Sequence, residues 1–206
     1  MKYLSVSFIF FMLFSCKKED ENLDLKYEVL NQLIHEDIVR DKQTNDSIKY
    51  IYKSYSATKI SFINLDKEKL ADNEIRPNTI EIKRDSIFSS KDLDFLVSQT
   101  TPYDSRKFDL DKEKIKDKIE IVKGSEITKI SIESKSVDDY WIKFRKKYGN
   151  KCLRSYSEPI FNLKKNICII RVSESCGPLW GGGFTGIYKK VNGTWVIIDS
   201  FDHWVS

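Results

Sequence analysis

The sequence predicts an α+β fold in which an antiparallel β-sheet, ending in a C-terminal meander, is covered by a few helices. The last fifty residues, 157–206, hold six of the eight glycines and three of the four tryptophans. Within them, β-branched and aromatic runs are separated by turn residues, which is the pattern of short strands. Hairpin signals, rather than alternating strand and helix patterns, favour α+β over a parallel α/β fold.

The C-terminal meander is predicted from three apolar runs, 166–173, 183–191 and 194–201. Asn192-Gly193 separates the last two, and this pair suits a tight type I′ turn because both central residues need φ > 0. Pro159 opens a short edge strand over 160–162. We expect the glycine-rich stretch from Cys176 to Gly183 to form a long connection between the first run and the hairpin.

Two helices stand out by their spacing and caps. Apolar residues recur every three to four positions in 24–38, and the polar stretch 41–46 that follows predicts a loop. Ser136 precedes an aromatic helical pattern in 137–148, and Gly149 follows it in the position of a C-terminal cap. We expect these two helices to cover one face of the sheet.

The middle of the chain is predicted to add strands and one short helix. Ser89 and Asp92 have the spacing of a capping box, which predicts a helix over 91–99. One helical turn is expected within 66–71. Alternating apolar and polar residues predict strands at 47–55, 59–64 and 79–83, although 47–55 also fits a helix. A second hairpin is predicted from 118–122 and 127–133.

Composition indicates one globular domain with a mixed surface. The 206 residues carry 35 basic and 31 acidic side chains, a formal charge of +4. The basic and acidic residues are mixed, and they do not form the basic stripe that is typical of nucleic-acid binding. We therefore expect a single α+β domain over 24–206 and no nucleic-acid partner.

The N-terminus has the pattern of an export signal. Lys2 precedes an eleven-residue apolar run, 4–14, which is too short to span a bilayer but suits a signal peptide. The run ends in Leu13-Phe14-Ser15-Cys16, which resembles the lipobox of bacterial lipoproteins. The resemblance implies a signal peptide over 1–15, lipidation of Cys16 and a charged tether over 16–23. The alternative is a short buried core segment that begins at Met1.

The C-terminal stretch resembles Bacteroidota-type lipoproteins of uncharacterised function. Their ends read Ser-x-Pro-Ile-Phe, Cys-Gly-x-x-Cys-Gly, Asn-Gly-x-Trp and Trp-x-Ser, and this chain departs from the pattern at Trp180, where a second cysteine is expected. The matching residues are Ser157, Pro159, Ile160, Phe161, Cys176, Gly177, Gly181, Asn192, Gly193, Trp195, Trp204 and Ser206. The resemblance implies a lipid anchor in the outer membrane, facing the periplasm or the cell surface. In that group, a charged run such as 17–21 resembles a surface-export signal, although it also suits a solvated linker.

Three cysteines remain once Cys16 is assigned to lipid: Cys152, Cys168 and Cys176. The cell envelope is oxidising, so one disulfide can form, and one thiol is then left over. The spacing does not choose among the three pairings. Cys168 lies in an apolar run and is expected to be buried.

The candidate site residues are Cys176, Trp180 and His203, from the glycine-rich stretch and the last strand. A Cys176–His203 pair could act as a nucleophile and base if the two segments meet. The simpler interpretation is a connection whose glycines adopt φ > 0 while Trp180 folds onto the sheet. No P-loop, dinucleotide or zinc-binding pattern is present in the sequence, so no cofactor or metal is predicted.

The function expected from these observations is a membrane-anchored envelope lipoprotein that acts as a binding or interaction module for a protein or small-molecule partner. One alternative is a cysteine-dependent enzyme centred on Cys176 and His203. Another is a toxin-neutralising, immunity-type lipoprotein.

Overall fold

The computed structural model describes residues 22–44, 48–56, 59–63, 79–83, 87–100 and 108–206, with the side chains of 59–63 and 79–83 left undescribed. The predictions for the signal peptide, Cys16 and the helical turn at 66–71 lie outside these residues. The elements are α1 (Leu23–Gln43), β1 (Lys49–Tyr55), β2 (Lys59–Ile63), β3 (Thr79–Lys83), α2 (Ser90–Ser98), the 3-10 helix η1 (Lys112–Lys114), α3 (Gly124–Glu133), α4 (Val137–Tyr148), β4 (Lys151–Ser157), β5 (Ile160–Phe161), β6 (Ile167–Gly177), β7 (Trp180–Val191) and β8 (Thr194–Val205).

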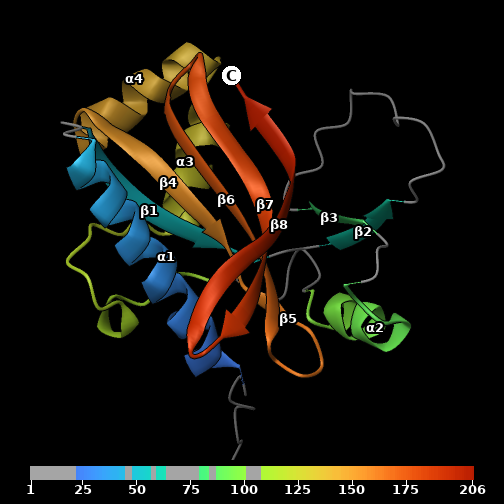
Figure 1. Cartoon of the computed structure of the whole chain (residues 1–206). Coiled ribbons are helices and arrows are strands. Elements are labelled where there is room, and N and C mark those ends of the chain that lie inside the picture. Colours follow the sequence, from blue (N-terminus) through green and yellow to red (C-terminus); the bar gives the residue numbers. More distant parts are fainter. Residues whose placement is uncertain (1–21, 45–47, 57–58, 64–78, 84–86, 101–107) are drawn as a thin grey trace, which may run out of the picture.

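The main sheet has the strand order β1-β4-β6-β7-β8, with β5 also paired to β6 (Figure 1). Strands β4 to β8 are joined by antiparallel pairs, which confirms the predicted α+β class with its C-terminal meander. β1 adds a parallel pair with β4. Both β4 and β5 pair with β6, and Pro159 between them interrupts what would otherwise be one continuous strand. The strands predicted near 59–64 and 79–83 form a separate parallel pair, β2 and β3.

The predicted β7–β8 hairpin is confirmed at its turn. Asn192 has φ 50° and Gly193 has φ 85°. Val191 then pairs directly with Thr194 across the turn. Because both turn residues adopt the left-handed conformation, the turn matches the twist of the two strands.

The glycine-rich connection predicted over 176–183 is not a loop. β6 continues to Gly177 and β7 starts at Trp180, so only two residues make the turn. The glycines of 181–183 therefore lie in β7, and none of them has a positive φ. At Gly183 the absence of a side chain permits close approach, since a Cβ atom there would lie 2.7 Å from the carbonyl oxygen of Val172.

The second predicted hairpin is wrong, because 124–133 forms the helix α3. Ile127 is buried in one apolar cluster with Trp141 and Phe144 of α4, and Ile130, three residues further along, is buried as well. Ile132, which completed the apparent alternation, is 79% exposed. The spacing that matters for burial is therefore helical, and the local alternation was coincidental.

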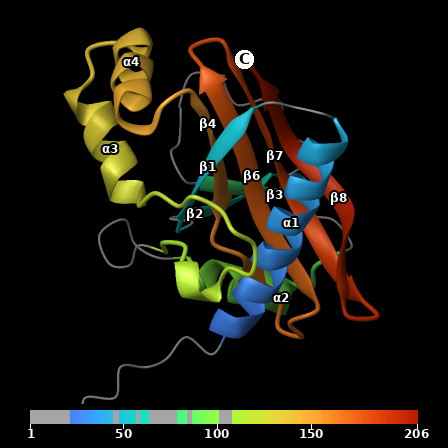
Figure 2. The same ribbon diagram turned by 90° about the vertical axis from the view of Figure 1, so that its left-hand side faces the viewer.

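The two best-predicted helices cover opposite faces of the sheet, not the same face. α1 packs on Tyr52, Cys168 and Ile170, whereas α3 and α4 pack on Ile51 and Leu153. Neighbouring residues of a strand point to opposite faces, so Ile51 and Tyr52, which are adjacent in β1, belong to different clusters. Figure 2 shows α1 on one side of the sheet and α3 with α4 on the other.

Helix ends follow the predicted caps, with one extension. Ser89 and Asp92 form a reciprocal capping box at α2, and the Ser136 hydroxyl accepts a hydrogen bond from the third residue of α4. Gly149 ends α4 with φ 80°. α1 runs to Gln43, so the start of the predicted loop 41–46 is helical. This extension puts Asp41 on the helix, where it faces the sheet.

Candidate functional site

A groove of about 580 Å³ lies between the C-terminal half of α1 and the face of the sheet that α1 covers. Its volume is in the range of small-molecule sites. Charged side chains of α1 line one wall and aromatic side chains of β1, β7 and β8 line the other. The charged and aromatic residues of the lining include Glu36, Asp37, Arg40, Asp41, Tyr50, Arg154, Glu174, Trp180, Phe184 and His203.

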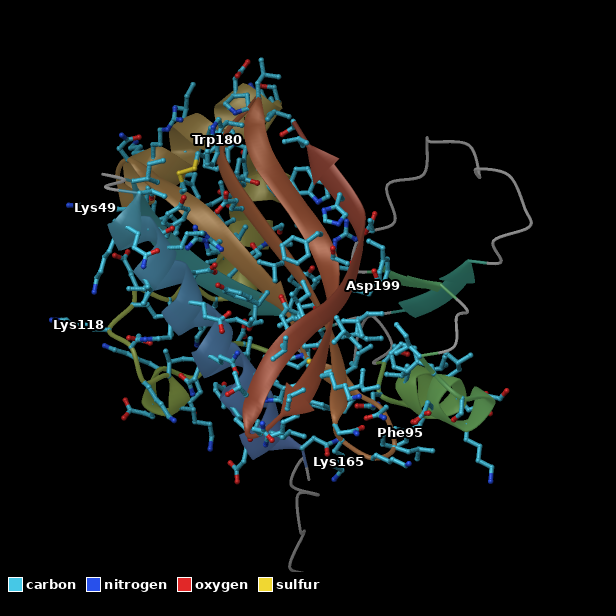
Figure 3. All side chains as sticks on the ribbon, viewed as in Figure 1. Lys49, Phe95, Lys118, Lys165, Trp180 and Asp199 are labelled. Atoms are coloured by element: carbon cyan, nitrogen blue, oxygen red, sulfur yellow. A yellow bond between two sulfur atoms is a disulfide. The ribbon has the colours of Figure 1, made fainter. Side chains whose placement is uncertain are left out.

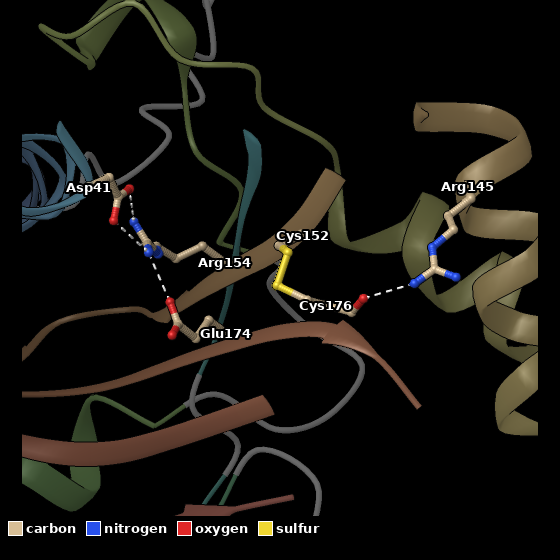
Figure 4. Close-up of a disulfide and its surroundings, with 6 residues drawn as sticks. All are labelled: Asp41, Arg145, Cys152, Arg154, Glu174 and Cys176. Carbon is tan, nitrogen blue, oxygen red and sulfur yellow. Dashed lines mark hydrogen bonds and ion pairs between the residues drawn. A yellow bond between two sulfur atoms is a disulfide. The ribbon is translucent and has the colours of Figure 1, made fainter. Parts of the chain in front are cut away.

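Arg154 of β4 forms the floor of the groove, and only 2% of its side chain is exposed. Both terminal nitrogens of its guanidinium donate to the Asp41 carboxylate, at 2.8 and 3.3 Å. One of them also donates to Oε2 of Glu174 on β6, at 2.8 Å. Figure 4 shows Arg154 held between these two acids. The Tyr50 ring covers the guanidinium, with Cζ 3.7 Å from the ring centre.

Asp37 extends this network into the protein core. Its carboxylate accepts a hydrogen bond from the hydroxyl of Tyr156 and lies 3.7 Å from the Arg154 guanidinium. Arg40, one turn further along α1, pairs with the same carboxylate. The network therefore joins α1 to β4 and β6 by charge-assisted hydrogen bonds, which are stronger than neutral ones.

Both the guanidinium and the phenol of this network keep their protons. Burial alone would lower the pKa of Arg154, but the hydrogen bonds that Arg154 donates to Asp41 and Glu174, together with the charge of Asp37, outweigh it, and the pKa is raised. Burial, followed by the charge of Asp37, raises the pKa of the Tyr156 hydroxyl well above its ordinary value. At any physiological pH, Arg154 is thus a cation and Tyr156 a hydrogen-bond donor.

A disulfide joins Cys152 of β4 to Cys176 of β6, which resolves the pairing that the sequence left open. The two cysteines are each two residues beyond the cross-strand pair Arg154 and Glu174, so the disulfide closes the same row at the end of the ladder. The carbonyl of Cys176 also accepts a hydrogen bond from Arg145 of α4, at 3.0 Å (Figure 4). The third cysteine, Cys168, is a free thiol and is buried as predicted.

Two of the three predicted site residues line the groove. Trp180, at the start of β7 and labelled at the upper end of the sheet in Figure 3, is 46% exposed. His203 of β8 stacks on Phe184 with ring centres 5.6 Å apart, and its Nε2 lies 3.0 Å from the Ser200 hydroxyl. Cys176 is not part of the lining. Because its sulfur is in the disulfide, the predicted Cys176–His203 nucleophile pair is not formed.

Sequence reasoning missed the charged floor of the groove. The stretch Lys151–Ser157 places Arg154 on the same face of its strand as Cys152 and Tyr156. An arginine in phase with two core-type residues is the signal that could have indicated a buried, ion-paired guanidinium. Its partners could not be found in this way, since Asp41 is 113 residues away in the sequence.

Within the ranges that the structure describes, no set of three or more His, Cys, Asp or Glu side chains is arranged to hold a metal ion. None of the helices in those ranges has the length and apolar character needed to cross a bilayer. Comparison with protein-family models, with curated proteins and with solved structures finds no match to this chain.

Proposed function

We propose that this chain is a lipid-anchored binding protein of a bacterial cell envelope, and that the groove between α1 and the sheet is its binding site. The observation that carries the proposal is that the floor of the groove is buried and paired, whereas an aromatic ring in its lining is exposed. Its buried floor around Arg154 is satisfied by protein partners, so it maintains the shape of the site. The ring of Trp180 at the rim keeps an open surface. A rigid floor with exposed aromatic groups is typical of ligand-binding sites.

The proposed anchor is supported by the order of features at the N-terminus. Lys2, the apolar run 4–14 and Cys16 follow one another as in an exported lipoprotein. The disulfide between Cys152 and Cys176 agrees with an oxidising compartment, because such bonds persist outside the cytosol.

The position of the groove suits a protein held at a membrane by Cys16. The residues between the anchor and α1, 16–22, span at most about 24 Å when extended. α1 has 21 residues and is therefore about 32 Å long. The groove is lined by its second half, from Leu33 to Thr44. Figure 1 shows the first and last turns of α1 at opposite ends of the helix. A domain tethered at the start of α1 would therefore hold the groove at the end away from the bilayer, open to ligands in solution.

The anchor is tested by metabolic labelling of cells with an alkyne fatty acid. We expect the wild-type chain to take up the label and to sediment with membranes. Cys16→Ala should abolish both, whereas Ser15→Ala, which keeps a small residue before the cysteine, should preserve them. An unlabelled wild-type chain in the soluble fraction would refute the anchor.

The binding site is tested by screening small molecules against the indole N–H resonances of the full-length chain in detergent. Bound compounds should shift the resonance of Trp180, assigned with Trp180→Phe. The resonance of Trp141, buried on the other face of the sheet, is the internal control. Compounds that shift Trp141 and leave Trp180 unmoved would place binding elsewhere and reject the groove.

A further inference from the structure

We propose that the ligand of this groove carries an organic cation, an ammonium or guanidinium group on an apolar stem. The inference rests on the proposed function, because it names the ligand class of the same site. Its basis is the net charge of the groove lining, the aromatic surfaces of that lining and the absence of a side chain at Gly182.

The groove has an excess of negative charge. Four carboxylates line it, from Glu36, Asp37, Asp41 and Glu174, against the two guanidinium groups of Arg40 and Arg154, a formal excess of two negative charges. The buried guanidinium of Arg154 is already engaged by two of these acids and is 2% exposed. An anionic ligand would therefore meet net repulsion and no accessible buried cation, whereas a cation would be attracted.

The aromatic wall provides surfaces that bind cations. The negative face of an aromatic ring attracts an ammonium or guanidinium group, and the indole of tryptophan is the best of these rings. The protein already uses one ring of the groove in this way, since the Arg154 guanidinium lies 3.7 Å from the centre of Tyr50. Trp180, in the same lining, is 46% exposed and has surface available for a second cation.

We place that cation beside Gly182, which lines the groove. This residue is between Trp180 and Phe184 on the same face of β7, and it pairs with Glu174 of β6. Trp180, Phe184 and Glu174 all line the groove together with Gly182, which places no side chain between the two rings. Glu174 uses Oε2 for Arg154 and keeps 35% of its side chain exposed, so its charge is available to a ligand. An apolar stem would then lie against the rings.

The test compares three probes that share a stem and differ in charge: pentylammonium, pentan-1-ol and pentanoate. Each is titrated into the full-length chain in dodecyl maltoside while the Trp180 indole resonance is followed. We expect pentylammonium to bind at least about tenfold more tightly than the alcohol, pentanoate not to bind, and the ammonium affinity to fall with added salt. A blocked Gly-Lys-Gly peptide, titrated in parallel, distinguishes a free amine from a partner's lysine side chain, and binding of either supports the cation class.

Variants then assign the charge. Glu174→Gln should weaken pentylammonium binding about fivefold and leave the alcohol unchanged. Because Glu174 also contacts Arg154, the exposed Glu36→Gln is a second variant, expected to weaken the ammonium about twofold. Glu113→Gln on η1, outside the groove, is the matched control with no effect.

The possible failures are distinguishable. If the alcohol and pentanoate bind as tightly as the ammonium, the groove is a binding site and the cation inference is refuted. If no probe or peptide moves the Trp180 resonance, the proposed function fails with it. Equal ammonium affinity in Glu174→Gln, Glu36→Gln and wild type would also overturn the assignment of the charge.

Discussion

Arg154 links three elements through one side chain, and the groove depends on it. Asp41 comes from α1, Glu174 from β6 and the guanidinium itself from β4. Burying these charges costs desolvation free energy, which is recovered only while every partner is present. The ion pairs of Arg154 therefore add less to net stability than their number suggests. The loss of one partner, however, leaves a buried charge unpaired and lowers the free energy of unfolding strongly.

We predict that Arg154→Met lowers the free energy of unfolding by about 3–5 kcal/mol, because it leaves carboxylates at the buried floor without their counter-charge. Arg40→Met makes the same chemical change at a side chain that is 59% exposed and should cost less than about 1 kcal/mol. Urea unfolding followed by circular dichroism measures both. Similar losses in the two variants would mean that Arg154 is not the centre of the network.

At the scale of elements, the disulfide is expected to stabilise the pairing of β4 with β6. Cys152 and Cys176 are 24 residues apart, and a loop of this length corresponds to about 3 kcal/mol of stabilisation. We predict that the double variant Cys152→Ser/Cys176→Ser loses about that amount in urea unfolding. Dithiothreitol should lower the stability of the wild type by a similar amount and leave the double variant unchanged. An effect of the reductant on the double variant would point to another cause.

The cap of α2 gives an element-scale prediction of pH dependence. The hydrogen bond from the Ser89 hydroxyl, at 2.6 Å, is the main cause that lowers the pKa of Asp92 below its ordinary value of 3.8. The backbone N–H of Leu163 also donates to this carboxylate, at 3.1 Å, and ties α2 to the turn after β5. A carboxylate with a lowered pKa in the folded state stabilises the fold above its unfolded pKa, and this contribution is lost as the pH falls through the folded value.

We therefore expect Asp92→Asn to reduce the free energy of unfolding by about 0.5–1 kcal/mol at pH 7, with the difference from wild type shrinking as the pH falls below the ordinary aspartate pKa of 3.8. The exposed Asp94→Asn on the same helix is the control for charge alone and should change little. Urea unfolding at several pH values measures all three chains. A pH-independent difference would show that the ionised carboxylate is not responsible.

Elements whose signal is local were predictable from the sequence, and those decided by distant partners were not. The turn at Asn192-Gly193 and the cap at Ser136 are set by backbone geometry within a few residues. The helix that contains Ile127 and Ile130 was misread because its burial is decided by α4, not by its own alternation. The parallel partner of β1 lies about a hundred residues away, beyond any local pattern.

The candidate site was predictable only in its aromatic part. Trp180 stands out in the sequence because it lies in a glycine-rich stretch, and His203 because the chain has only two histidines. Both residues line the groove. Asp41 and Glu174 are two of 31 acidic residues, and nothing local distinguishes them. Their role follows from the fold, which brings both to the buried Arg154.

At the scale of the whole molecule, α1 connects the proposed anchor to the groove and sets the distance between them. Its first turns lie near the turn of the β7–β8 hairpin, where the indole of Trp195 donates to Glu28 at 3.1 Å. Its last turns carry Asp41 at the groove, on the same side as Trp180. The two tryptophans thus mark opposite ends of the helix, which makes the orientation of the anchored domain measurable.

We predict that the lipidated chain, bound to nanodiscs that contain a paramagnetic headgroup lipid, shows stronger broadening of the Trp195 indole N–H resonance than of the Trp180 resonance. The reason is that the proposed tether over 16–23 would hold the start of α1 near the bilayer, with the groove about one helix length, roughly 30 Å, further away. The Cys16→Ser chain mixed with the same nanodiscs is the control and should show no position-dependent broadening. Equal or stronger broadening of Trp180 would mean that the groove faces the membrane, and its ligand would then have to be sought among lipid headgroups.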